Sequence, residues 1–107
     1  MTKRAILPLL AVLLAPLPAR AEDVGDIASG RRLAETWCSS CHVVGPTGGN
    51  VVSNGAPTFT AIAADRAITV LSLRAFLQTP HGRMPDLHLS RDEVDDLASY
   101  ILSLRTK

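Results

Sequence analysis

The stretch GDIASGRRLAETWCSSCH, residues 25–42, contains a helix signal that leads directly into both cysteines of the chain. Asp26 is a good N-cap, and the apolar residues from Ile27 to Trp37 recur at roughly a 3.6-residue period. These features predict an amphipathic helix that begins after Asp26 and runs into Cys38. Gly30 lies inside this helix, where it costs about 1 kcal/mol relative to alanine. It is either merely tolerated there or needed for the close approach of another backbone or ring.

The spacing of Cys38, Cys41 and His42 is compatible with a thiol–disulfide switch, half of a zinc site or an anchor for haem. A structural zinc usually takes four ligands, and the chain has no second cysteine pair. A thioredoxin-like site expects a βαβ pattern, which is absent, and a disulfide closing so short a loop would stabilise little.

C-x-x-C-H is, by contrast, a specific signal for covalent attachment of haem c. Two thiols one helical turn apart can add to the two vinyl groups on one edge of a porphyrin. The histidine that follows then offers a ring nitrogen to the iron. The sequence therefore predicts one haem c bound through Cys38 and Cys41, with His42 as the proximal iron ligand.

The rest of the chain predicts an all-α domain with three to five helices and long loops around the haem, because no alternating strand pattern occurs. Residues 43–57 are rich in glycine and proline and predict a loop. Further helices are expected over residues 58–65, after the N-cap Thr69, and after Ser90, which forms a capping-box signature with Glu93.

The sixth position of the iron has three candidates, which are Met84, His81 and His88. Met84 is the only methionine besides Met1, and Pro85 pushes its backbone towards an extended conformation suited to a loop ligand. Met84 is therefore the predicted distal ligand, with the two histidines as alternatives. A thioether favours Fe(II), so His/Met ligation raises the reduction potential and gives a low-spin haem closed to substrates.

The N-terminus has the layout of a cleavable signal peptide over residues 1–21. Lys3 and Arg4 precede an apolar run, and Ala19-Arg20-Ala21 forms a small-x-small cleavage site. The alternative is a retained membrane anchor. A membrane-spanning helix needs about 20 apolar residues, and this apolar run is shorter. Export would place the mature domain, residues 22–107, in an oxidising compartment such as the periplasm, without stable membrane insertion. Its 8 basic residues against 10 acidic ones exclude a basic nucleic-acid footprint.

Three segments together resemble the class I (mono-haem) cytochrome c family: GDIASGRRLAETWCSSCH, HGRMPDLHLS and EVDDLASYILSLR. The resemblance covers nearly all of residues 24–107. It implies thioether bonds at Cys38 and Cys41, His42 as proximal ligand and Met84 as distal ligand. It also implies that the Pro57 carbonyl accepts a hydrogen bond from His42, with Pro46 as the alternative acceptor.

The same resemblance implies that Gly30 lets the first helix cross the last one closely, against Tyr100. The chain also departs from the family. Ala34 stands where the family often has an aromatic residue, so either Trp37 fills the space or the crossing is tighter. Lys107 is the only lysine of residues 22–107, so the ring of lysines found on mitochondrial members is absent. Five arginines could instead form a patch near the haem edge, namely Arg31, Arg32, Arg66, Arg74 and Arg83.

These observations predict a periplasmic one-electron carrier without catalytic residues, which exchanges electrons with other redox proteins. Such encounters are typically small and transient, and we expect a monomer or a transient complex. One alternative is a dedicated haem subunit of a periplasmic dehydrogenase complex. Others are a haem enzyme or gas sensor with a displaceable sixth ligand, and a thiol oxidoreductase without haem.

Overall fold

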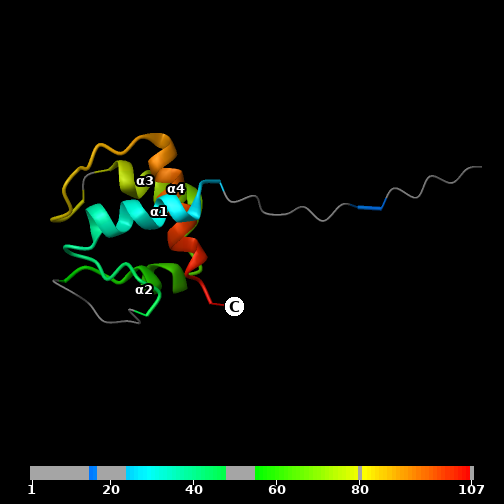
Figure 1. Ribbon diagram of the computed structural model, residues 1–107, viewed down its shortest axis with the longest axis horizontal. Helices are drawn as coiled ribbons and strands as arrows, with labels where there is room; N and C mark the ends of the chain where they lie inside the picture. Colours follow the sequence, from blue (N-terminus) through cyan, green and yellow to red (C-terminus); the bar gives the residue numbers. More distant parts are fainter. Residues whose placement is uncertain (1–14, 17–23, 48–54, 80, 107) are drawn as a thin grey trace, which may run out of the picture.

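The computed structural model describes residues 15–16, 24–47, 55–79 and 81–106. Its elements are α1 (Ile27–Leu33), the π-helical turn η1 (Ala34–Cys38), α2 (Phe59–Ala64), α3 (Val70–Gln78) and α4 (Arg91–Ser103). Within these ranges the chain forms no strand, and one isolated bridge pairs His81 with Met84. The all-α prediction is confirmed (Figure 1). The signal peptide expected over residues 1–21 lies outside the described residues, except for Ala15 and Pro16.

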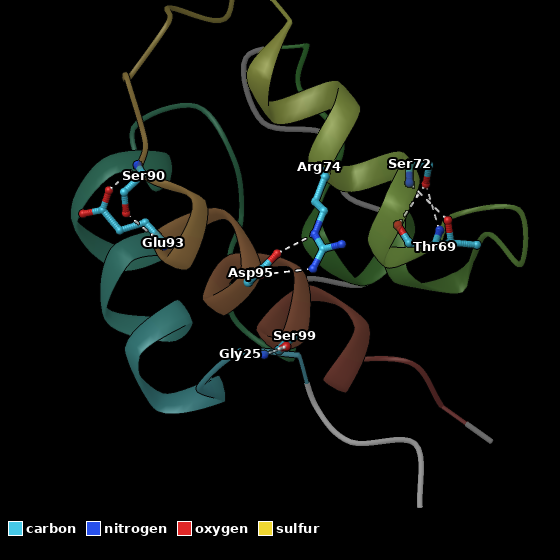
Figure 2. A network of polar contacts seen from close by, with 8 residues as sticks. All are labelled: Gly25, Thr69, Ser72, Arg74, Ser90, Glu93, Asp95 and Ser99. Carbon is cyan, nitrogen blue, oxygen red and sulfur yellow. Dashed lines mark hydrogen bonds and ion pairs between the residues drawn. The ribbon is translucent and has the colours of Figure 1, made fainter. Parts of the chain in front are cut away.

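Side-chain caps fix where the helices begin. The Asp26 side chain accepts a hydrogen bond from the Ser29 amide, and the Thr58 side chain accepts one from the Ala61 amide. Two full capping boxes, Thr69 with Ser72 and Ser90 with Glu93, begin α3 and α4 (Figure 2). The predicted caps at Asp26, Thr69 and Ser90 are thus confirmed, because each satisfies an amide that a helix leaves without a partner.

The main packing contact of the fold is the crossing of α1 over α4. Gly30 is buried in it, and a Cβ at this position would collide with the Asp96 carbonyl and lie 2.8 Å from Tyr100 Cβ. A Cβ on Gly25 would collide with the α4 backbone at Asp95 and Asp96 in the same way. Of the two roles considered for Gly30, close approach of another backbone is therefore confirmed.

Ala34 and Trp37 show how α1 packs on α4 without an aromatic residue at position 34. Ala34 is 0% exposed and belongs to the core, whereas Trp37 is 58% exposed. The expectation that Trp37 fills the space is therefore wrong. The small side chain of Ala34 is enclosed because the glycines bring α1 and α4 close together, so no aromatic ring is needed there.

Polar contacts hold the other helices against α4. The guanidinium of Arg74 on α3 donates two hydrogen bonds to the Asp95 carboxylate, at 2.6 and 3.1 Å (Figure 2). Arg105, just beyond α4, donates to the carbonyls of Ala63, Asp65 and Ile68 at 2.7–3.1 Å. These carbonyls lie at the end of α2 and in the turn that follows. The helices α1, α2 and α3 therefore all pack on α4, and the core and the candidate site lie between these helices.

Candidate haem-binding site

A cavity of about 640 Å³ opens between the helices, and its walls are mainly apolar. It is lined by η1, α2, α3 and α4 together with residues from the connecting segments 40–42, 55–57 and 81–87 and with Ile68 between α2 and α3. Leu73, Leu97 and Ile101, all nearly fully buried, form part of its wall. This size and this apolar lining are typical of sites that hold a small molecule or a cofactor.

The two cysteines and the histidine of the motif all line this cavity. Cys38 is the last residue of η1, and the chain then turns back, because the amides of Cys41 and His42 both donate to the Cys38 carbonyl at 3.2 and 2.9 Å. Both thiols are free. Burial raises the pKa of Cys38 to about 11, so this thiol is protonated at neutral pH.

The His42 ring is held in one orientation. Its Nδ1 lies 2.6 Å from the Pro57 carbonyl oxygen, and its ring centroid lies 5.4 Å from that of Phe59. Because a carbonyl can only accept, Nδ1 carries the proton, and Nε2 keeps the lone pair that a metal ligand needs. The acceptor in the structure is thus Pro57, rather than the alternative Pro46.

Two hydrogen bonds anchor the loop that follows His42. The Phe59 amide donates to the Val43 carbonyl at 3.0 Å, which ties the loop to the start of α2. The Tyr100 hydroxyl donates to the Val44 carbonyl at 2.6 Å in a buried position, which ties the loop to α4. Sequence reasoning missed both bonds, because neither a backbone pairing nor a distant tyrosine leaves a local pattern in the sequence.

Met84 lines the same cavity, from a segment 42 positions further along the chain than His42. Its amide donates to the His81 carbonyl at 3.2 Å, closing a turn in which Gly82 takes a positive φ of 50°. The Met84 side chain is half-buried. The structure therefore brings Met84 together with Cys38, Cys41 and His42, as the sequence predicted for this candidate set.

The two alternative ligands differ in their positions. His81 also lines the cavity, and its Nδ1 donates to the Thr79 carbonyl at 2.7 Å, which leaves Nε2 with a lone pair as at His42; the centroid of its ring lies 3.6 Å from that of Phe76. The His88 side chain is 86% exposed, lies 3.5 Å from the Asp86 carboxylate and is not part of the cavity wall. His88 is therefore placed away from the candidate site.

The five arginines considered as a patch do not act as one group. Arg31 pairs with Glu35 at 2.8 Å, Arg32 donates to Ser29, and Arg74 is held by Asp95. Arg83 alone among the five lines the cavity. The hypothesis of a continuous arginine patch is therefore not supported by the geometry of these side chains.

The comparisons with known proteins agree with this geometry. Residues 25–101 match the model of the family described as cytochrome C oxidase, cbb3-type, subunit III. The chain is also 42% identical over 102 residues to a cytochrome c-552 of Bradyrhizobium diazoefficiens strain USDA 110, covering 95% of this chain and 94% of the relative. The chain belongs to the mono-haem c-type cytochrome family. No solved structure matches this cytochrome.

Membership of the family means that the cytochrome binds haem c covalently and transfers electrons. The observed site fits that cofactor, because one apolar cavity is lined by a C-x-x-C-H segment, an oriented imidazole and a thioether side chain. When bound, the haem supplies a one-electron Fe(III)/Fe(II) couple. Within the described ranges, none of the helices combines the length and hydropathy needed to cross a membrane.

Proposed function

We propose that this cytochrome is a periplasmic one-electron carrier whose haem c is low-spin with His/Met ligation. In this proposal Cys38 and Cys41 hold the haem by thioether bonds, His42 is the proximal ligand and Met84 is the distal ligand. The proposal rests on one observation. These four side chains line one apolar cavity, although Met84 lies far from the other three in the sequence.

Groups of the protein around the haem would set the strength of the iron ligands and the reduction potential of such a carrier. The hydrogen bond that His42 Nδ1 donates to the Pro57 carbonyl orients the imidazole and makes Nε2 a better electron donor to iron. Met84 supplies a soft thioether, which favours Fe(II) and raises the reduction potential. With both axial positions held by side chains, the site would exchange electrons without binding oxygen or peroxide.

Export is supported by the sequence of residues 1–21, which carry the charge, the apolar run and the cleavage site of a signal peptide. Removal of this segment would leave residues 22–107 as the cytochrome domain. The expected partners are donor and acceptor redox proteins in transient complexes. Since Lys107 is the only lysine of the mature domain, docking would not depend on a lysine ring.

A second candidate function is a dedicated haem subunit of a larger oxidoreductase complex. It is favoured by the description of the matching family model, which names an oxidase subunit. The chemistry at the iron would be the same, and the partner would be permanent. Purification from native membranes and periplasm separates the two functions, because a carrier is recovered as the free protein and a subunit is recovered with its enzyme.

The test of the ligand assignment uses the periplasmically matured protein. We expect a mass equal to residues 22–107 plus one haem, a methionine–iron charge-transfer band in the oxidised spectrum, and no carbon monoxide binding by the ferrous protein at neutral pH. Met84→Ala should abolish the band and allow carbon monoxide to bind. His88→Ala is the matched control, because His88 lies outside the cavity, and it should change neither property.

If the native ferrous protein binds carbon monoxide readily, the sixth position is open or weakly held and the sensor or enzyme hypothesis returns. A Met84→Ala variant that keeps the charge-transfer band would contradict the role of Met84 itself.

A further inference from the structure

Arg83 is distinguished from the other residues of the cavity wall by its charge. It is the only residue with a permanent charge among the described residues that line the cavity. Its side chain is exposed and forms no hydrogen bond or ion pair with the part of the chain that the structure describes. By contrast, Arg31, Arg74 and Arg105 are all held by carboxylates or carbonyls.

A haem brings two propionate carboxylates into its site, on the edge opposite its vinyl groups. The vinyl edge would be fixed at Cys38 and Cys41, so the propionates would reach parts of the wall formed by other segments. A carboxylate beside an apolar wall needs donors, and a guanidinium binds it with two parallel, charge-assisted hydrogen bonds.

Trp37 offers the cavity wall one neutral indole N–H donor, and the remaining polar side chains of the wall are less suited to this task. His81 uses its Nδ1 to donate to the Thr79 carbonyl, and the Ser72 hydroxyl donates to the Thr69 carbonyl while accepting from its amide. Ser40 lies between the two cysteines, at the vinyl edge. A charged group with free donors is thus available at Arg83 and not at these positions.

We propose that Arg83 binds a haem propionate and that its positive charge raises the reduction potential of the cytochrome. This inference rests on the proposed function, since it assumes a haem held at Cys38 and Cys41 with Met84 as distal ligand. The pairing would also hold the segment of Met84 against the haem edge, because Arg83 and Met84 are adjacent in the chain.

The experiment compares haem-loaded wild type with Arg83→Gln, Arg83→Lys and the control Arg66→Gln. Arg66 is also an exposed arginine, and it is not part of the cavity wall, so its variant removes the same charge without touching the site. Two properties are measured at fixed pH and ionic strength: the propionate bending bands in the resonance Raman spectrum and the midpoint potential. The methionine–iron charge-transfer band of each protein shows whether Met84 is still bound.

In Arg83→Gln we expect the propionate band to shift and the equilibrium constant for reduction to fall roughly tenfold to twentyfold, the size expected for a unit charge about 10 Å from iron at an effective dielectric constant of about 20. Arg83→Lys keeps the positive charge but cannot form the bidentate pair of hydrogen bonds with a carboxylate. Its midpoint potential should therefore stay close to that of wild type, while the propionate band should still shift. Arg66→Gln should leave both properties close to wild type.

The inference is overturned if the propionate bands of both Arg83 variants equal those of wild type, or if Arg83→Gln and Arg66→Gln change the potential equally. If either result is found in proteins that keep the charge-transfer band, the proposed His/Met carrier stands without this role for Arg83. Wild type that lacks the band would overturn the ligation itself and the inference with it.

Discussion

Gly30 occupies a position at which a single added methyl group would reach the backbone of another helix. Its absent side chain leaves room for the Asp96 carbonyl and for Tyr100 where α1 crosses α4. We expect Gly30→Ala to lower the free energy of unfolding by about 1–3 kcal/mol, the usual cost of overpacking. Alanine would favour an isolated helix by about 1 kcal/mol, so any loss must come from the crossing.

Denaturant titration of the haem-loaded protein measures this loss, and Gly45→Ala provides the control. A Cβ at Gly45 would meet nothing within 4 Å, so this variant should unfold at nearly the wild-type concentration of denaturant. Equal stability of Gly30→Ala and wild type would contradict the close crossing.

Tyr100 secures the loop that follows His42 through its hydroxyl group. Tyr100→Phe keeps the ring against Phe59 but leaves the buried Val44 carbonyl without its 2.6 Å donor. Since an unsatisfied buried polar group costs about 1–3 kcal/mol, we expect a loss of stability in that range. Thermal or denaturant unfolding checks it.

The control for Tyr100→Phe is Ser103→Ala, which removes an exposed hydroxyl from the same helix. Ser103 donates only to the Tyr100 carbonyl, and we expect a change within about 0.5 kcal/mol for such a surface substitution. If the two variants lose the same stability, the hydrogen bond to the loop has no special role.

Residues whose roles follow from their immediate neighbours in sequence were predictable, and others were not. Gly30 was recognised as a point of close approach, but Gly25 was missed, since it precedes the helix and its contact is with α4, far along the chain. Packing by Trp37 was one of two alternatives for the space beside Ala34, and the structure shows the other, a tighter helix crossing. The sequence showed that Ala34 stands where the family often has an aromatic residue. It did not show how closely α1 and α4 approach each other.

At the scale of elements, the helix starts were predictable because capping is local. Asp26, Thr69 and Ser90 each accept a hydrogen bond within three residues of the chain. The π-helical turn η1 was not predictable, because the apolar period from Ile27 to Trp37 is equally compatible with a regular helix. Such turns often occur at functional sites, and this one ends at Cys38, where the candidate site begins.

The contact between α3 and α4 gives the fold a predictable pH dependence. The hydrogen bonds from Arg74 hold the pKa of Asp95 below its ordinary value. A carboxyl group with a depressed folded-state pKa stabilises the fold above its unfolded pKa of about 3.9, and this contribution is lost as the pH falls through the folded value.

We therefore expect Asp95→Asn to be less stable than wild type at pH 7, with the difference shrinking as the pH falls below about 4. Denaturant unfolding of the haem-loaded protein at a series of pH values measures it. Glu35→Gln is the control, because the Arg31–Glu35 pair is more than half exposed and should contribute little at any pH. A difference for Asp95→Asn that stays constant down to pH 3 would contradict the assignment.

At the scale of the whole molecule, the sequence predicted the members of the candidate site better than their surroundings. Cys38, Cys41 and His42 lie within five consecutive positions, and Met84 was selected because residues 22–107 contain no other methionine. The choice of Pro57 over Pro46 depended on the path of the loop, which is visible only in three dimensions. The cavity itself is built from all parts of the chain, so no local pattern could have given its lining.

The central claim is that His42 and Met84 hold one iron between them in this cavity. Because Met84 is the only methionine of residues 22–107, a protein of these residues labelled with ¹³C-methyl methionine should give a single methyl signal. In the diamagnetic ferrous state, ring-current shielding should move that signal far upfield of its position in an unfolded chain. A Met84 methyl signal at the ordinary position in the haem-loaded ferrous protein would contradict the account.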